Sequence, residues 1–320
     1  MKLDGIHHIT AITEDGQANV DFYAGVMGLR LVKKSVNQDN PSVYHLFYAD
    51  ETGDPGSDLT FFEYPGIPRG RAGDGMIHRI VWRVASEEAL AFWQERLGAH
   101  GVASERLHDV PALRFADPEG LEHELLVSDA PDEPLVADHP EVPAELALQG
   151  FDGVCAYSSD PAASRSLLVA TLGFEERESW AGSGGGEEGL YEVRGPERGS
   201  WYAYHEPPAE AERGLQGAGT VHHVAWSSSM EEHEAWRERL VAAGLHPTPV
   251  IDRFYFRSIY FREPSGVLFE IATKGPGFTV DEPLEDLGEK ISIPPFLEHL
   301  RDEIEPNLRP ITNPRRAAAR

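Results

Sequence analysis

Apolar residues recur at helical spacing in four segments of the chain, and a glycine follows each segment. In the second segment Leu90, Trp93 and Leu97 fall on one helical face, and Gly101 comes after them. A glycine at that place is typical of a helix that ends in the left-handed conformation. The pattern predicts four helices about 70 residues apart, which indicates an internal repeat. They are expected at residues 19–27, 87–100, 162–172 and 231–243.

Short strand patterns surround every predicted helix. One apolar strand precedes each helix, and two or three more follow it. The sequence therefore predicts an α+β protein built from four βαβββ modules. One module cannot cover its own sheet face, so modules must pair around a shared, cup-shaped interior under a mixed sheet. The leading strands are expected at residues 6–12, 77–84, 154–158 and 221–227, and later ones at 44–48, 59–64, 121–127, 201–204 and 267–273.

A stretch rich in proline and acidic residues, 129–146, separates the second module from the third and indicates a linker. After residue 274 the repeat stops, and a tail with a predicted helix at 296–304 follows. The predicted division is a first two-module domain at 1–130, a linker at 131–147, a second two-module domain at 148–280 and a C-terminal extension at 281–320.

The formal net charge of −26 bears on the partners. Nucleic-acid-binding proteins present a basic face to phosphates, so no DNA or RNA partner is expected. No apolar stretch reaches membrane-spanning length, and residues 1–12 lack the layout of a signal peptide. The single cysteine, Cys155, is expected in the core. We therefore expect a cytoplasmic protein with no membrane partner, and both a monomer and a homo-oligomer fit the sequence.

Comparison of the four modules isolates unusual residues in their first strands. The first and fourth modules carry histidine doublets, His7-His8 and His222-His223. In the second module, alignment on the shared tryptophan places Arg79 opposite His223, and the third module has no imidazole there. Only the first and fourth modules therefore offer histidine at equivalent places.

The last strands can be aligned on the glycine that precedes them. Glu270 in the fourth module and Glu124 in the second occupy the same place, where the other two modules have Thr60 and Ala203. Pairing the first and fourth modules gives a complete set of two imidazoles and one carboxylate. The predicted metal ligands are His8, His223 and Glu270.

Two neutral imidazoles and one carboxylate on one face of a divalent ion leave positions open for substrate and dioxygen. A single histidine or glutamate in a strand is more often a hydrogen-bonded core group or a solvated charge. The two doublets at equivalent places, with Glu270 inside an apolar strand, favour metal binding, because a buried charge needs a partner. In a regular strand His7 and His8 face opposite sides, so both reach the cup only through a local twist. A competing set, His78 with Glu124, is weaker because Arg79 would repel a cation.

These residues lie in stretches that resemble the vicinal oxygen chelate superfamily, and within it the ring-cleaving dioxygenases that act on hydroquinones. The resemblance covers nearly the whole chain and implies two glyoxalase-like domains. Its most specific parts are GIHHIT at 5–10 and GTVHHVAW at 219–226. Further stretches that resemble this family are at residues 31–50, 54–65, 252–271 and 293–305.

The resemblance implies oxidative cleavage of a small aromatic dihydroxybenzene by O2. It implies Fe(II), or Mn(II) in its place, bound by His8, His223 and Glu270. Proton donors and acceptors are needed for the phenolic oxygens, and an arginine can hold a developing anion. The residues to which the resemblance assigns roles around the metal are His7, Thr10, His222, Arg253 and Tyr260.

Three other functions stay open at this point. A catechol extradiol dioxygenase would use the same ligands. A glyoxalase-like isomerase or lyase would use Zn, Ni or Mn as a Lewis acid, but it usually needs a second carboxylate ligand, and Thr60 and Ala203 do not supply one. A protein that only sequesters an aromatic molecule would need no metal.

Overall fold

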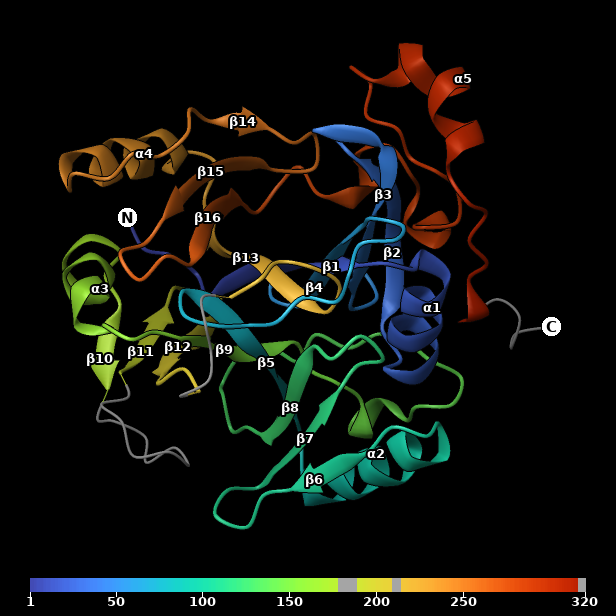
Figure 1. Cartoon of the computed structure of the whole chain (residues 1–320), viewed down its shortest axis with the longest axis horizontal. Helices are drawn as coiled ribbons and strands as arrows, with labels where there is room; N and C mark the ends of the chain where they lie inside the picture. Colours follow the sequence, from blue (N-terminus) through green and yellow to red (C-terminus); the bar gives the residue numbers. More distant parts are fainter. Residues whose placement is uncertain (178–188, 209–213, 316–320) are drawn as a thin grey trace.

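The computed structural model describes residues 1–177, 189–208 and 214–315 (Figure 1). The chain forms two eight-stranded mixed sheets, with strand orders β14-β15-β16-β13-β1-β4-β3-β2 and β10-β11-β12-β9-β5-β8-β7-β6. The predicted α+β class with four repeated modules is confirmed. In the part of the chain that the structure describes, no helix is both long and apolar enough to cross a bilayer.

The four modules follow one another along the chain. The first has β1 (Ile6–Thr13), α1 (Gly16–Val20), a π-helix (Asp21–Val26), β2 (Arg30–Asn37), β3 (Asn40–Ala49) and β4 (Asp58–Glu63). The second has β5 (Met76–Val84), α2 (Glu87–Ala99), β6 (Ser104–Arg106), β7 (Ala112–Ala116) and β8 (Glu122–Val127). The third has β9 (Phe151–Tyr157), α3 (Ala162–Ser166), a π-helix (Leu167–Thr171), β10 (Glu175–Arg177), β11 (Leu190–Arg194) and β12 (Gly199–His205). The fourth has β13 (Thr220–Ser228), α4 (His233–Ala242), β14 (Ile251–Asp252), β15 (Arg257–Arg262) and β16 (Leu268–Thr273).

Each sheet joins modules from opposite halves of the chain. The antiparallel pairing of β1 with β13 unites the first and fourth modules, and that of β5 with β9 unites the second and third. The predicted ranges 1–130 and 148–280 therefore divide the sequence, while each range gives one module to each sheet. Each sheet is completed within one chain, because the first strand of one module pairs with the first strand of another module.

The tail helix is shorter than predicted. Residues 296–300 form tight turns in which each amide bonds the carbonyl three residues back, as Leu297 does with Pro294. Only α5 (Arg301–Ile304) is α-helical. Phe296 is 51% exposed, so only part of this segment, with Leu297 and Leu300, packs against the core, which is little support for a longer α-helix. Residues 316–320 of the predicted extension lie outside the described residues.

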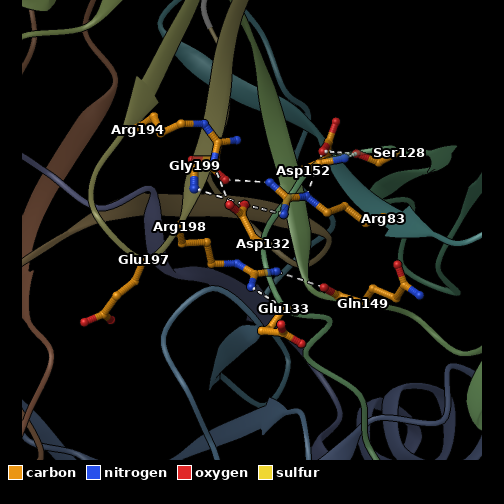
Figure 2. Close-up of polar contacts among 12 residues, drawn as sticks. Arg83, Ser128, Asp132, Glu133, Gln149, Asp152, Arg194, Glu197, Arg198 and Gly199 are labelled. Atoms are coloured by element: carbon orange, nitrogen blue, oxygen red, sulfur yellow. Dashed lines mark hydrogen bonds and ion pairs between the residues drawn. The ribbon is translucent and has the colours of Figure 1, made fainter.

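The linker at 131–147 is fixed to the second sheet by buried arginines (Figure 2). Arg83 on β5 donates to Asp152 (2.8 Å), to the linker residue Asp132 (2.6 Å) and to the carbonyl of Gly199 (2.6 Å). Arg198 donates to the carbonyl of Glu133 at 2.9 Å. The Asp132 carboxylate, together with Asp152, thus neutralises the Arg83 guanidinium, which burial would otherwise leave uncompensated.

A hydrogen-bonded chain links the first and second modules inside the core. Trp82 Nε1 can only donate, so His123 Nδ1 accepts a hydrogen bond from it at 3.1 Å. The hydrogen of the neutral His123 ring is therefore on Nε2. His123 Nε2 lies 3.0 Å from Tyr23 Oη, which donates to Asp117 Oδ2 at 2.9 Å. The chain therefore requires a neutral imidazole.

This chain should make the protein less stable in acid. Burial is the main cause that lowers the pKa of His123 from 6.5 to about 3. Below pH 6.5 the unfolded chain binds a proton that the folded chain refuses, so stability falls as pH falls toward the folded pKa. The slope from this one group is at most about 1.4 kcal/mol per pH unit. We expect urea melts between about pH 7 and 5 to show a flatter dependence for His123→Gln than for the native chain. If the stability of both proteins changed equally with pH, His123 would not be the group that destabilises the fold in acid.

Candidate active site

Irregular pairing of β1 with β13 brings the two imidazoles of each histidine doublet into contact. The register shifts between Ile6 and His8 and again between Thr10 and Ala11, where the partner strand carries His222. Such bulges re-aim side chains. His7 Nδ1 lies 3.0 Å from His8 Nδ1, and His222 Nδ1 lies 2.8 Å from His223 Nδ1. The local distortion that the doublets required is therefore present.

His8, His223 and Glu270 converge on one point. His8 Nε2 lies 3.3 Å from His223 Nε2 and 3.2 Å from Glu270 Oε2, and His223 Nε2 lies 2.9 Å from Glu270 Oε2. Metal bonds of about 2.1 Å at right angles would place neighbouring ligand atoms about 3 Å apart. The three side chains, the first from β1, the second from β13 and the third from β16, thus have the spacing of a ligand set on one face of an ion.

The Glu270 carboxylate is an unusual group for a protein interior. The residue is 0% exposed, and neither of its oxygens has a hydrogen-bond partner among the described residues. The two imidazole nitrogens approach Oε2 closely without hydrogen-bond geometry. A buried carboxylate in this state is costly, and a cation at the convergence point would compensate it. The residues therefore fit a divalent metal.

Hydrogen bonds behind His8 leave its Nε2 available as a ligand. His7 Nε2 lies 3.0 Å from the carbonyl oxygen of Thr273, which can only accept, so this nitrogen carries a hydrogen. His7 Nδ1 then accepts from His8 Nδ1. The lone pair of neutral His8 is therefore on Nε2, the atom that faces Glu270.

Charges in the metal-free site are coupled. Burial would raise the pKa of Glu270, but His8 and His223 hold that pKa well below 4.5. Burial would lower the pKa of His8, but the Glu270 carboxylate raises it above 6.5. Burial lowers the pKa of His223. The ionised Glu270 therefore favours the protonated form of His8 when no metal is bound.

Arg253 and Tyr260 stand beside the ligands. Tyr260 on β15 pairs in register with Glu270, and its ring lies 5.6 Å from that of His223. Burial raises the pKa of Tyr260, so the hydroxyl keeps its proton at neutral pH. Arg253 Nε donates to Tyr260 Oη at 3.3 Å. The guanidinium pairs with Asp39 at 3.0 and 3.2 Å, across the cup.

A small cavity of about 40 Å³ lies over the ligands. The tip of the β2–β3 hairpin closes it, because Gln38 donates to the carbonyl of Arg253 at 2.8 Å and Asp39 holds the guanidinium. In Figure 1 this tip lies beside the segment that contains β14 and β15. The volume is enough for a few water molecules. Its lining includes His8, Thr10, His45, Phe62, His223, Arg253 and Tyr260.

His7 and His222 occupy different positions from the other predicted site residues. Neither lines the small cavity, and each contacts a proposed ligand through Nδ1. His222 lines a larger cavity of about 650 Å³, which His223 also borders. These two residues can therefore orient the ligands, while Thr10, Arg253 and Tyr260 face the space above them.

Comparison of the four modules in the sequence did not identify two further residues near the site, His45 and Asp58. His45 Nε2 lies 2.9 Å from Thr60 Oγ1, which lies 2.8 Å from Thr10 Oγ1. Burial lowers the pKa of His45 well below 6.5, so its imidazole is neutral. Asp58 is the register neighbour of His8, and its buried carboxylate oxygens have no partner among the described residues. Burial raises the pKa of Asp58 to about 7. For Asp58 the sequence held one indication: side chains alternate along a strand, so Asp58 and Thr60 lie on the same face of β4.

Comparison with known proteins gives consistent matches along the chain. The profile described as the glyoxalase/bleomycin resistance protein/dioxygenase superfamily matches residues 5–125 and 150–271. MhqA of Bacillus subtilis, provisionally named a ring-cleaving dioxygenase, is 42% identical over 97% of this chain and 100% of its own. A chlorohydroquinone/hydroquinone 1,2-dioxygenase of Sphingobium indicum is 31% identical over 95% of each chain.

Solved structures extend these matches. A provisionally assigned Bacillus subtilis dioxygenase superposes with a TM-score of 0.90 at 39% identity, over 98% of both chains. Glyoxalase I of Zea mays gives a TM-score of 0.61 at 13% identity, over 84% of this chain and 92% of its own. The second likeness shows the shared fold alone.

Proposed function

Because the chain belongs to the glyoxalase/bleomycin resistance protein/dioxygenase superfamily, we propose that it is a ring-cleaving dioxygenase for a hydroquinone-type substrate. Fe(II) would be held by His8, His223 and Glu270. The observation that carries the proposal is the fully buried Glu270 carboxylate, which faces two imidazoles and has no hydrogen-bond partner among the described residues. The names of the relatives from Bacillus and Sphingobium support ring cleavage and a hydroquinone substrate.

Each side chain around the cavity has a task that follows from its chemistry. Bound Fe(II) supplies the one-electron chemistry that lets an aromatic ring react with O2. Tyr260, protonated and held by Arg253, donates a hydrogen bond to a substrate oxygen. Arg253 holds negative charge that develops on that oxygen. The hydroxyl of Thr10, fixed through Thr60 to His45, orients a substrate hydroxyl.

Substrate entry requires the β2–β3 hairpin tip to move. A cavity of about 40 Å³ does not admit a benzene ring with two hydroxyl groups. The contacts that hold the tip are the Asp39–Arg253 pair and the Gln38 hydrogen bond. The Asp39 side chain is largely exposed, and exposed ion pairs contribute little to stability. The tip can therefore open at small cost and close again to exclude water during the reaction.

The isomerase or lyase alternative has less support. In the first sheet the place opposite Glu270 belongs to Thr60, whose hydroxyl bonds Thr10. No second carboxylate joins the described group of His8, His223 and Glu270. The partner we propose is a small aromatic molecule, and the buried thiol of Cys155 agrees with a cytoplasmic location.

The deciding experiment is oxygen uptake after anaerobic loading with Fe(II). Hydroquinone, catechol and the methylglyoxal–glutathione adduct are supplied in parallel assays. Uptake with hydroquinone is the expected result. Uptake with catechol alone would change the substrate class, and turnover of the adduct without oxygen consumption would overturn the dioxygenase proposal.

Metal affinity should weaken in acid. The pKa of His8 is raised above 6.5 by Glu270, so a proton competes for Nε2 as pH falls through that pKa. Below it, affinity should fall by up to about tenfold per pH unit for one displaced proton. Calorimetric titration with Mn(II), which is stable in air, at about pH 8, 7 and 6 measures this. An affinity that does not change over this range would contradict the coupling.

A further inference from the structure

The second sheet repeats the first strand for strand, but not its ligand set. Register pairs place Arg79 where the first sheet has His223, Gly153 where it has His8, and Glu124 where it has Glu270. Arg114 donates to Glu124 at 2.6 Å. A Cβ atom on Gly153 would lie 2.2 Å from the ring of Trp201, so the indole fills that space. Guanidinium groups and an indole therefore close the equivalent of the proposed iron site.

A different group of ligand atoms lies elsewhere on this sheet. His78, Cys155 and His205 each offer one ligand atom, and the three atoms lie within 4.8 Å of one another. They come from three adjacent strands, β5, β9 and β12. A register shift between Ile77 and Arg79 places His78 at a bulge, as in the histidine doublets of the first sheet. The contact between His78 Nε2 and His205 Nδ1, 3.0 Å, resembles the 3.3 Å contact of His8 with His223.

We propose that His78, Cys155 and His205 bind a thiophilic d10 cation, Cu(I) or Zn(II), at a second site independent of the proposed iron. One thiolate with two imidazoles is a donor set for these soft or borderline ions, and it lacks the carboxylate of the first site. Nothing in the proposed ring cleavage uses these three residues.

The protonation states support this site. Burial lowers the pKa of His78 and, as the main cause, brings that of His205 to about 3, so both imidazoles are neutral. Burial raises the pKa of the Cys155 thiol to about 12, so the thiolate forms only when a coordinated cation displaces the proton. His78 Nδ1 is buried and has no hydrogen-bond partner among the described residues, and the Glu122 carboxylate lies 3.5 Å away. A carboxylate behind a ligand imidazole is a common arrangement at metal sites.

Carboxylates next to the site offset the positive charge of the neighbouring arginines. Arg79 pairs with Glu122 at 3.1 Å and with Glu124 at 3.5 Å, and Arg114 pairs with Glu124. The two guanidinium charges are therefore paired with two carboxylates, which reduces the repulsion expected from Arg79. A cavity of about 490 Å³ is bordered by His78, Glu122 and Tyr157, so it reaches the proposed site from the His78 side.

Because Cys155 is the single cysteine, its sulfur can be observed directly. Co(II), a spectroscopic stand-in for Zn(II), should produce a thiolate-to-metal charge-transfer band with the full-length protein. Zn(II) should remove that band. Competition between the protein and a chromophoric Cu(I) chelator, without oxygen, then shows which ion binds more tightly.

Cys155→Ser and His205→Gln should each abolish the band and remove one equivalent of bound ion, with circular dichroism unchanged. His205 lies at the end of β12 and is only half-buried, so its variant remains informative if Cys155→Ser does not fold. His223→Ala, which removes a proposed iron ligand, should keep the band. Absence of the band from the folded native chain, or the same number of bound ions in both variants as in the native chain, would overturn this site and leave the proposed iron site untouched.

Discussion

Glu270→Gln is expected to abolish iron retention and hydroquinone-dependent oxygen uptake together. The substitution keeps the size of the side chain and removes the one negative charge that faces His8 and His223 in a buried site. Loss of a ligand should exceed the roughly 10- to 100-fold effect typical of groups that only orient ligands. Iron content after gel filtration and the rate of oxygen uptake measure the two quantities separately.

Glu124→Gln is the matched control for this experiment. Glu124 occupies the same register position in the second sheet, is equally buried and accepts a hydrogen bond from Arg114. Glutamine can still accept that bond, so iron content and oxygen uptake should stay near the native values. If Glu270→Gln retained iron and turnover, the assignment of the metal site would be wrong.

Tyr260→Phe is expected to slow oxygen uptake without loss of metal. The hydroxyl is the only part removed, and burial keeps it protonated, so the substrate oxygen loses a positioned proton donor. Loss of such a group typically costs about 100- to 10,000-fold in rate. The measured quantities are kcat for hydroquinone and the iron content of the same sample.

Tyr44→Phe is the matched control, and it tests whether the slower oxygen uptake is specific to loss of the hydroxyl at Tyr260. Tyr44 is a buried tyrosine of β3 whose hydroxyl donates to the carbonyl of Arg309 at 2.9 Å, away from the cavity. Its loss should affect stability only, by about 1 kcal/mol. Native turnover in Tyr260→Phe would remove this residue from the mechanism.

The two sheets show how one repeated unit supports two different sites. In the first sheet the concave face carries two imidazoles and a carboxylate, and among the described residues no arginine pairs with that carboxylate. In the second, Arg79 and Arg114 neutralise Glu124 at the equivalent place. The fold therefore fixes where side chains point, while the residue at each register position decides what can bind there.

The sequence by itself determined the repeat and the proposed ligand set. Helical spacing that ends at glycine, with strands on both sides, defined four modules, because local periodicity reflects which face of an element is buried. Comparison among modules then singled out His8, His223 and Glu270, since equivalent residues in a repeat occupy equivalent places. The structure brings these three side chains together.

Only the tertiary structure decided which edges pair and which distant side chains meet. The sheets join the first module with the fourth and the second with the third, because strand pairing depends on long-range hydrogen bonds that no local pattern encodes. The contact of Asp39 with Arg253, the chain from His45 to Thr10 and the meeting of Cys155 with two histidines all depend on that pairing. Side chains far apart in sequence become neighbours only when the sheets close, which is why their chemistry could not be read from spacing.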